Sequence, residues 1–153
     1  GERTPHNDPH IRGSFHAIKT TTDATNMQYA VIDGVSFGIL DGVNSILKVN
    51  DNFEQIFMVG GGSRSSFWIE LLASLLNRNL SVCDQSEYGA ALGVARLAMH
   101  SDKSIQNNNI IKEITTSKDY FPSSNKSDIL MKRYQIWKDL YSTNKKIASN
   151  LIS

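Results

Sequence analysis

The stretch with the clearest chemical potential is residues 56–68, where an apolar run ends in three glycines and a helix-type pattern follows at once. Glycine has no Cβ, so its turn can adopt positive φ and bring backbone amides against a ligand. The helix that begins after the turn presents unpaired N–H groups and the positive end of its dipole. Strand, glycine turn and helix start therefore predict a site for nucleotide phosphate or ribose around Gly60, Gly61 and Gly62.

The spacing around these glycines excludes a P-loop and argues against a dinucleotide-binding loop. A P-loop needs a lysine directly after its glycines, and the sequence has none between Lys48 and Lys103. The dinucleotide fingerprint G-x-G-x-x-G matches Gly60 and Gly62 but meets Ser65 in place of its third glycine. A dinucleotide-binding domain is therefore the weaker alternative, and a tight turn that only packs a helix on its strand is the other.

Composition places the chain among ordinary globular proteins. Its 153 residues are 40% hydrophobic and 20% charged, with a formal net charge of +1, so neither nucleic acid nor a membrane is expected as a partner. The single Cys83 excludes an intramolecular disulfide and is typical of a reducing, cytoplasmic environment. The sequence has no stretch of 18 or more apolar residues, so no membrane span is predicted. The polar start without methionine predicts a piece of a longer protein.

A possible metal site near the start of the chain is rejected. His6 and His10 lie four residues apart with Asp8 between them, which imitates a metal-binding pair. Pro5 and Pro9 keep this segment from forming a helix, so the two imidazoles do not share a helix face. No metal site is therefore predicted in this chain.

The glycine turn has to be positioned by an alternation of strands and helices. Strands are predicted at residues 14–18, within 53–59, at 80–83 and at 110–114. Helices are predicted at residues 24–49 after the N-cap Asp23, in the stretch after Ser65, at 87–98 and beyond Pro122. This order of elements predicts an α/β fold.

The helix predicted at residues 24–49 carries glycines and acidic residues whose spacing indicates how the helix packs. Gly34, Gly38 and Gly42 recur every four residues and so share one face. Since each mid-helix glycine costs about 1 kcal/mol relative to alanine, this stripe predicts another element packed close to the backbone. Asp33 and Asp41 are interpreted as polar positions of a helix near a domain cleft, and not as paired catalytic carboxylates.

Four motifs, in order and at family-like spacing, resemble the FGGY carbohydrate kinases, and among them most closely the xylulokinases. They are GERTPHNDP with RGSF in residues 1–15, AVIDGVSFG at 30–38, GGGSRS at 60–65 and EYGAALG at 87–93. A final helix rich in Tyr and Trp follows. The resemblance implies the actin-like, ribonuclease H-like ATPase fold. Residues 1–153 would be the C-terminal FGGY kinase domain, the ATP-binding half of the kinase, with an incomplete sheet and without the N-terminal sugar-binding and catalytic domain.

The resemblance also implies a function and its residues. Such kinases transfer the γ-phosphate of ATP to a sugar hydroxyl, here that of D-xylulose to give xylulose 5-phosphate. Gly61 and Gly62 would contact ATP through their backbone. Gly60 would shape the turn, and Ser65 would hydrogen-bond the nucleotide from the start of the helix. Residues 87–93 would back the adenine pocket by packing.

The resemblance implies that the family's catalytic aspartate, sugar-binding residues and phosphate-binding hairpin would lie in segments upstream of Gly1. The expected cofactor is ATP with Mg²⁺, the metal being held mainly by ATP and the missing domain, and this chain alone is expected to be inactive. Gluconokinase, ribulokinase and glycerol kinase are alternatives within the family. A non-catalytic nucleotide-binding or interaction fragment of a split gene is the alternative from another class.

The chain departs from the family pattern, and its incomplete sheet implies partners. Relatives often carry arginine where this chain has Ala24 and Tyr29, and glutamate is usual at Asp33. Besides ATP and a pentulose sugar, the expected partners are a second copy of the chain or the N-terminal half. If upstream strands are missing, residues 14–18 would offer an unpaired edge that invites such association.

Overall fold

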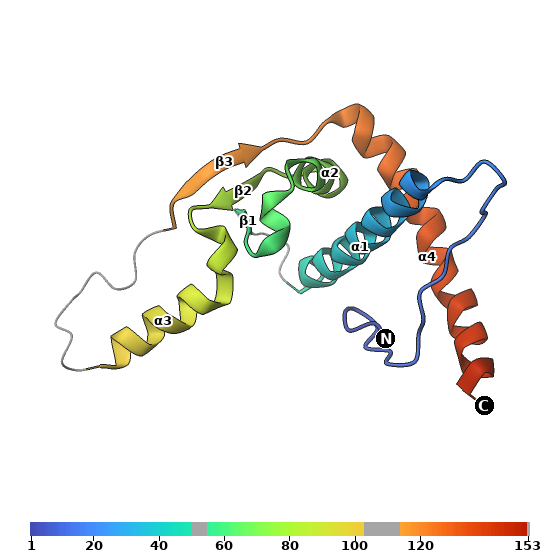
Figure 1. The fold of residues 1–153 in the computed structure, drawn as a ribbon, viewed down its shortest axis with the longest axis horizontal. Helices are drawn as coiled ribbons and strands as arrows, with labels where there is room; N and C mark the ends of the chain where they lie inside the picture. The colour runs from blue at the N-terminus through green and yellow to red at the C-terminus, as the bar shows by residue number, and fades with distance from the viewer. Residues whose placement is uncertain (50–54, 103–113, 153) are drawn as a thin grey trace. The chain divides into compact units, whose positions relative to one another are not determined.

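The computed structural model describes residues 1–49, 55–102 and 114–152, and the chain divides into two compact units. Residues 1–53 and 124–153 form the first unit, and residues 54–123 form the second. The first unit contains the N-terminal segment with helices α1 (Ala24–Leu47) and α4 (Ser124–Ile152), and the second contains the sheet (Figure 1). The family-like motif GGGSRS falls in the second unit, so that unit positions the glycine turn.

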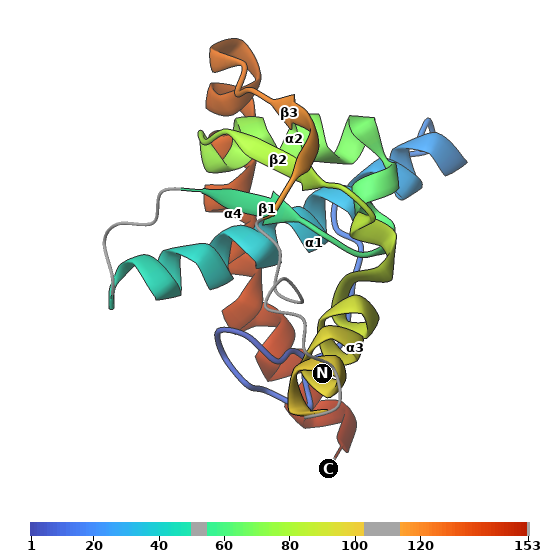
Figure 2. The ribbon, with the colours of Figure 1, turned by 90° about the vertical axis from the view of Figure 1, so that its left-hand side faces the viewer.

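The second unit is built on a three-stranded sheet with the order β1-β2-β3. Strand β1 (Ile56–Met58) pairs in parallel with β2 (Leu80–Cys83), and β2 pairs antiparallel with β3 (Thr116–Tyr120). Helix α2 (Ser66–Leu76) connects β1 to β2 and lies against the strands (Figure 2). The prediction of an α/β fold is confirmed, and the sheet is small.

The core of the second unit forms because α2 turns an apolar face toward the strands. Ile69, Leu72 and Ala73 of α2 are at most 1% exposed and pack with Leu80 and Val82 of β2. Each fully buried aliphatic side chain contributes about 1.5–3 kcal/mol. This core therefore fixes β1 and α2 relative to each other, and these two elements are the two ends of the glycine turn.

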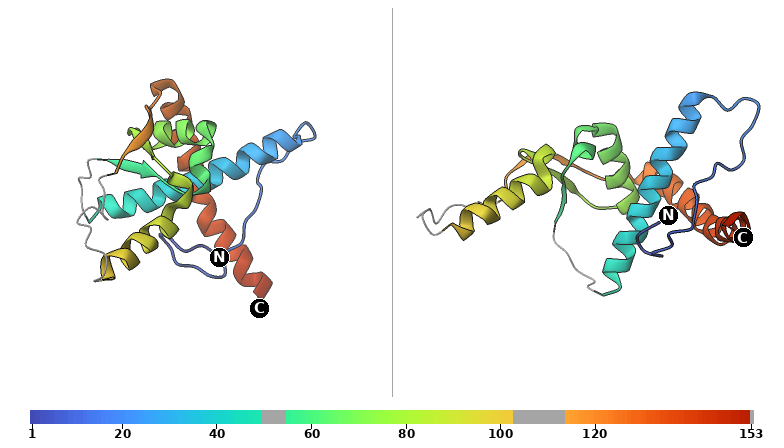
Figure 3. Two further views of the ribbon diagram at one scale, coloured as in Figure 1. Left: turned by 60° about the vertical axis from the view of Figure 1, so that its left-hand side comes forward. Right: turned by 60° about the horizontal axis from the view of Figure 1, so that its bottom comes forward.

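In the first unit, α1 and α4 cross and pack through aromatic side chains (Figure 3). Phe37 of α1 is 3% exposed, and its ring centroid lies 5.9 Å from that of Trp137 on α4. A Cβ on Gly34 would lie 3.8 Å from the indole nitrogen of Trp137. This is ordinary van der Waals contact, and a Cβ on Gly38 would meet nothing within 4 Å, so the close packing predicted for the glycine stripe is not seen at these two positions.

Polar contacts also join these two helices. Arg133 of α4 pairs with the carboxylate of Asp33, which is 2% exposed. Tyr134 donates a hydrogen bond to Asp41 and accepts one from Asn44 at 3.2 Å. Burial, together with the bond to Asp41, raises the pKa of Tyr134 to about 12. Asp33 and Asp41 therefore each have a partner on α4, and neither has to pair with the other.

Helix α1 is long and apolar enough, by length and composition alone, to cross a membrane. The core helix of a globular domain passes the same test, so this property is weak evidence of a membrane span. The contacts of α1 indicate the core role, because Asp33, Asp41 and Asn44 along it all bind side chains of α4. These polar side chains are expensive in a lipid environment.

The strand predicted at residues 14–18 is wrong, since this segment has no regular secondary structure. Ala17 has a φ of 59°, which interrupts an extended chain. Ser14 and His16 hydrogen-bond Asn144 of α4 at 3.0 and 3.2 Å, where a strand would need a neighbouring strand. The unpaired edge expected to drive self-association is therefore not formed by these residues.

The other predicted elements are confirmed with shifted ends, apart from the strand predicted at 110–114, most of which lies outside the described residues. The helix predicted at 87–98 is two elements, a 3₁₀ turn η2 (Ser86–Tyr88) and helix α3 (Gly89–Ser101). Gly89 has φ 36° and ψ −119°, which interrupts the helix between them. The prediction that residues 1–153 form one domain stays a prediction.

Candidate functional site

The glycine turn leaves β1 through a conformation that favours glycine. Gly60 has φ 84° and ψ −173°, a region that residues with a Cβ rarely adopt. A short 3₁₀ helix, η1 (Gly61–Arg64), follows before α2 begins. Gly61 is exposed, and a Cβ added to it would meet nothing within 4 Å. The predicted turn is therefore present with an open backbone at Gly61, and its contact with a nucleotide stays a prediction.

The third glycine of the turn is required by packing. A Cβ on Gly62 would lie 2.6 Å from Cζ3 of Trp68, well inside contact distance. Side chains of a helix lean toward its N-terminus, so Trp68 in the first turn of α2 reaches back over Gly62. Trp68 is half-buried and also packs against the core of the second unit. The indole therefore fixes the position of the Gly62 backbone.

Ser65, the fourth predicted site residue, is the N-cap of α2. Its Oγ accepts a hydrogen bond from the backbone N–H of Trp68 at 3.3 Å. A hydroxyl has two acceptor lone pairs and one donor, so capping leaves its O–H available. Ser65 is exposed. It can therefore cap α2 and still donate a hydrogen bond outward, as the predicted nucleotide contact requires.

A second loop, between β2 and α3, lies directly against the turn. The Gly60 N–H donates to the Ser86 carbonyl at 2.6 Å, and the Oγ atoms of Ser63 and Ser86 lie 2.7 Å apart. A Cβ on Gly89 would lie 3.8 Å from the Gly60 nitrogen. The sequence singled out residues 87–93 on this side. It gave no signal that Ser63 and Ser86 contact each other, because two serines 23 residues apart carry no local pattern.

An ion pair spans the same two loops. Arg64 of η1 pairs with Glu87 of η2, and the two side chains are 72% and 42% exposed. Exposed pairs of this kind contribute only about 0–1 kcal/mol to stability. The pair neutralises Arg64. Besides Arg64, the turn offers a phosphate its backbone amides and the Ser65 hydroxyl.

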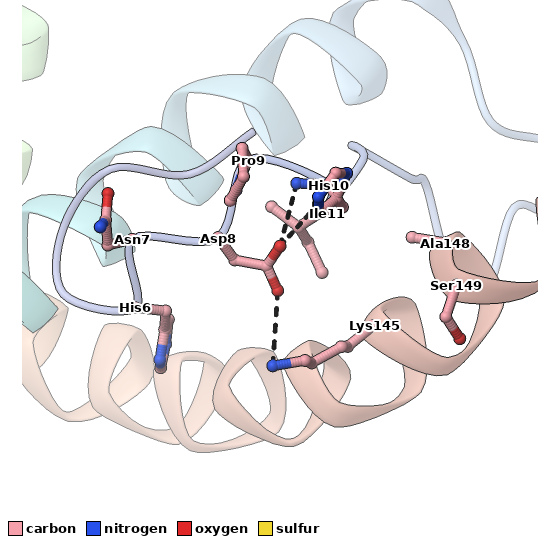
Figure 4. Close-up of a pocket in the computed structure, with 9 residues that line it drawn as sticks. All are labelled: His6, Asn7, Asp8, Pro9, His10, Ile11, Lys145, Ala148 and Ser149. Atoms are coloured by element: carbon pink, nitrogen blue, oxygen red, sulfur yellow. Dashed lines mark hydrogen bonds and ion pairs between the residues drawn. The ribbon is translucent and has the colours of Figure 1, made fainter. Parts of the chain in front are cut away.

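The first unit contains a hollow of about 450 Å³ between the N-terminal segment and α4 (Figure 4). The Asp8 carboxylate accepts hydrogen bonds from the N–H groups of His10 and Ile11 at 2.9 and 3.2 Å and from the Tyr141 hydroxyl at 3.1 Å. The Nζ atom of Lys145 lies 3.6 Å from the same carboxylate. Asp8 is thus fully engaged in holding the N-terminal segment on α4.

The pair of histidines that imitates a metal site is separated by these contacts. The His6 ring stacks on Tyr141 with ring centroids 3.8 Å apart. Among the described residues, no group of three or more His, Cys, Asp or Glu side chains is placed to hold a metal ion. The motif at the start of the chain therefore acts as an anchor for its own loop.

Replacing Asp8 with alanine is expected to release the N-terminal segment from α4. The backbone N–H of His10 is the main cause that lowers the pKa of the Asp8 carboxyl in the folded state. The stability that the Asp8 carboxylate contributes is therefore present above the ordinary pKa of 3.8, and it is lost as the pH falls through the lower folded value. Trypsin should therefore cut Asp8→Ala faster than wild type within residues 1–23 at pH 7, with Asp139→Ala as the control on the exposed side of α4. Equal rates would show that Asp8 is no anchor.

Comparison with known proteins identifies a family and several relatives that are similar to this chain. Residues 1–101 match the C-terminal domain of the FGGY family of carbohydrate kinases. The xylulose kinase of Staphylococcus epidermidis is 28% identical over the whole chain, and that of Escherichia coli is 27% identical over 92% of it. The chain spans 31% and 29% of the lengths of these two relatives.

Solved structures agree with the sequence relatives. A xyloylose kinase from Brucella ovis is 31% identical with a TM-score of 0.80, covering 96% of this chain and 30% of that one. A ligand-bound xylulose kinase from Lactobacillus acidophilus is 25% identical with a TM-score of 0.74, covering 99% of this chain and 31% of that one. The predicted actin-like ATPase fold is confirmed, with a small, incomplete sheet. The family model matches residues 1–101 of the 153, a stretch that includes the glycine turn and the loop against it, and the chain therefore belongs to the FGGY family of carbohydrate kinases.

Proposed function

We propose that this chain is the C-terminal, ATP-binding part of a sugar kinase that phosphorylates D-xylulose. The correspondence with xylulose kinases along nearly the whole chain is the main support, because it includes the glycine turn and both elements that position it. The family name makes a carbohydrate the phosphoryl acceptor. The relatives reported above are xylulose kinases, which favours xylulose as that carbohydrate.

In this proposal ATP lies against the open side of the glycine turn. The exposed backbone at Gly61 and the Ser65 hydroxyl would bind its phosphate or ribose, and Gly62 would keep the turn in place beneath Trp68. Phosphoryl transfer depends on positioning and charge neutralisation by several groups at once. The chain spans about a third of its relatives, so the catalytic base, the sugar contacts and most of the Mg²⁺ environment would belong to the rest of the kinase.

A charge placed on the turn tests nucleotide binding. Gly61→Asp should weaken ATP binding by tenfold or more in calorimetry, because the carboxylate would repel phosphate while its Cβ meets no neighbour. Asn79→Asp is the matched control, since it adds the same charge at an exposed position between α2 and β2. Similar ATP affinity in both variants and wild type, or none in wild type, would contradict the proposal.

A substrate panel tests the sugar. D-Xylulose should support ADP release by the complete kinase, and this chain by itself should give none. Gluconate is the second candidate, because a gluconate kinase from Lactobacillus acidophilus is 26% identical with a TM-score of 0.73 over 94% of this chain. Turnover with gluconate and not with xylulose would replace the proposed substrate and leave the ATP-binding role intact.

A further inference from the structure

We propose that Ser86 is a positioning residue that holds the glycine turn in the shape required to bind ATP. The proposal rests on the function proposed above and adds a residue outside the glycine turn itself. Ser86 begins η2, in the loop between β2 and α3. It would act on the nucleotide only through Gly60 and Ser63, the residues of the turn that it contacts.

The hydrogen bonds between the two loops form a closed ring. The Gly60 N–H donates to the Ser86 carbonyl at 2.6 Å. The Ser63 hydroxyl donates to the Gly60 carbonyl at 2.7 Å, which leaves the Ser86 hydroxyl as donor to Ser63 Oγ at 2.7 Å. Backbone and side chain of Ser86 thus fix both the N–H and the C=O of Gly60. The two bonds that share the Ser63 hydroxyl strengthen each other, because each polarises the next.

The glycine turn needs the hydrogen bonds of Ser86, because the elements at its two ends do not fix Gly60. Its ends are fixed by β1 and α2, but Gly60 lies between them at a φ of 84° that no helix or strand imposes. Ser63 is 9% exposed, so water has little access to its hydroxyl. On the opposite loop, Gln85 has a left-handed φ of 56° just before Ser86. A non-glycine residue in that region costs free energy, which indicates that the surrounding contacts hold the loop there.

Loss of the Ser86 hydroxyl should therefore loosen the turn without removing any group that touches the nucleotide. Ser86→Ala is expected to weaken ATP binding by about three- to tenfold, the usual worth of one hydrogen bond. The amide hydrogen of Gly60 should exchange faster in this variant even without nucleotide. Ser86→Thr keeps a hydroxyl and should restore both properties close to wild type.

Two further variants separate positioning from a general effect on folding. Ser101→Ala removes a hydroxyl that donates to the Leu97 carbonyl within α3 at 3.0 Å, and should leave ATP affinity and Gly60 exchange unchanged. The double variant Ser63→Ala/Ser86→Ala should bind ATP no more weakly than Ser63→Ala alone, since the two serines belong to one chain of bonds.

The measurements distinguish failure of this proposal from failure of the proposed function. Wild-type ATP affinity in Ser86→Ala, or losses that add up in the double variant, would overturn the positioning role. Absence of ATP binding by wild type would refute the proposed function and the role in binding together. Gly60 exchange would then still show whether Ser86 holds the turn, because that measurement needs no nucleotide.

Discussion

Replacing Arg133 with methionine is expected to lower the free energy of unfolding at neutral pH by about 3 kcal/mol, the cost of leaving a buried charge without its partner. Asp33 is 2% exposed, and within the described residues Arg133 is the cation that pairs with its carboxylate. The Arg133 side chain is 44% exposed, and its guanidinium carbon lies 5.6 Å from the ring centre of Tyr29. Methionine keeps the packing of the side-chain stem, so the loss would report mainly on the charge of Asp33.

The pH dependence of this loss follows from the pKa of Asp33. Burial raises that pKa above the ordinary 3.8, and Arg133 opposes the rise. Without Arg133 the folded pKa should be higher still. The folded state then binds a proton more readily than the unfolded state, so stability is gained as the pH falls through the raised folded value toward 3.8. Chemical denaturation at a series of pH values should show the deficit of Arg133→Met shrinking on acidification.

Two controls isolate the ion pair. Lys132→Met removes a neighbouring, exposed cation of α4 and should cost no more than about 0.5 kcal/mol. Asp33→Leu/Arg133→Met replaces the whole pair with apolar groups and should recover most of the lost stability. If Arg133→Met were as stable as Lys132→Met, the pair would not hold α4 on α1.

Asp33 of this pair and Tyr29, which lies beside Arg133, occupy two positions where the chain departs from the expected family pattern. The resemblance expects glutamate at position 33 and often arginine at position 29, where this chain has Asp33 and Tyr29. In the structure the cation comes from α4, and the tyrosine ring lies beside it. The sequence could not reveal this pair, because position 133 lies 100 residues away from position 33.

The glycine turn was predictable because its pattern is local. Three glycines, an apolar strand before them and helical spacing after them lie within residues 56–68, and the structure forms the turn, with η1 and α2, in that order. The strand predicted at residues 14–18 failed for the opposite reason, since a strand needs a partner that the pattern does not contain. Phe15 and Ile18 are 47% and 60% exposed. Ser86 escaped prediction because its contacts with Gly60 and Ser63 are made in three dimensions only.

Replacing Gly62 with alanine is expected to lower the free energy of unfolding by about 2 kcal/mol, as overpacking usually does. The new methyl group would lie 2.6 Å from the Trp68 ring, so the indole or the turn must move. Gly61→Ala is the matched control in the same turn, because its Cβ meets nothing within 4 Å, and should cost at most about 0.5 kcal/mol. With Trp137 replaced by phenylalanine, the emission of Trp68 alone should shift in Gly62→Ala and stay unchanged in Gly61→Ala.

A double-mutant cycle identifies the cause of that loss. If the clash with the indole is responsible, Gly62→Ala should cost little in a chain that already carries Trp68→Leu, because the shorter side chain leaves room for the methyl group. An equal cost in both backgrounds would place the strain in the backbone of the turn. The distinction matters for ATP binding. If the turn moves to relieve the clash, the Gly61 and Gly62 amides are displaced, so nucleotide affinity should fall in Gly62→Ala and return in part when Trp68 is shortened.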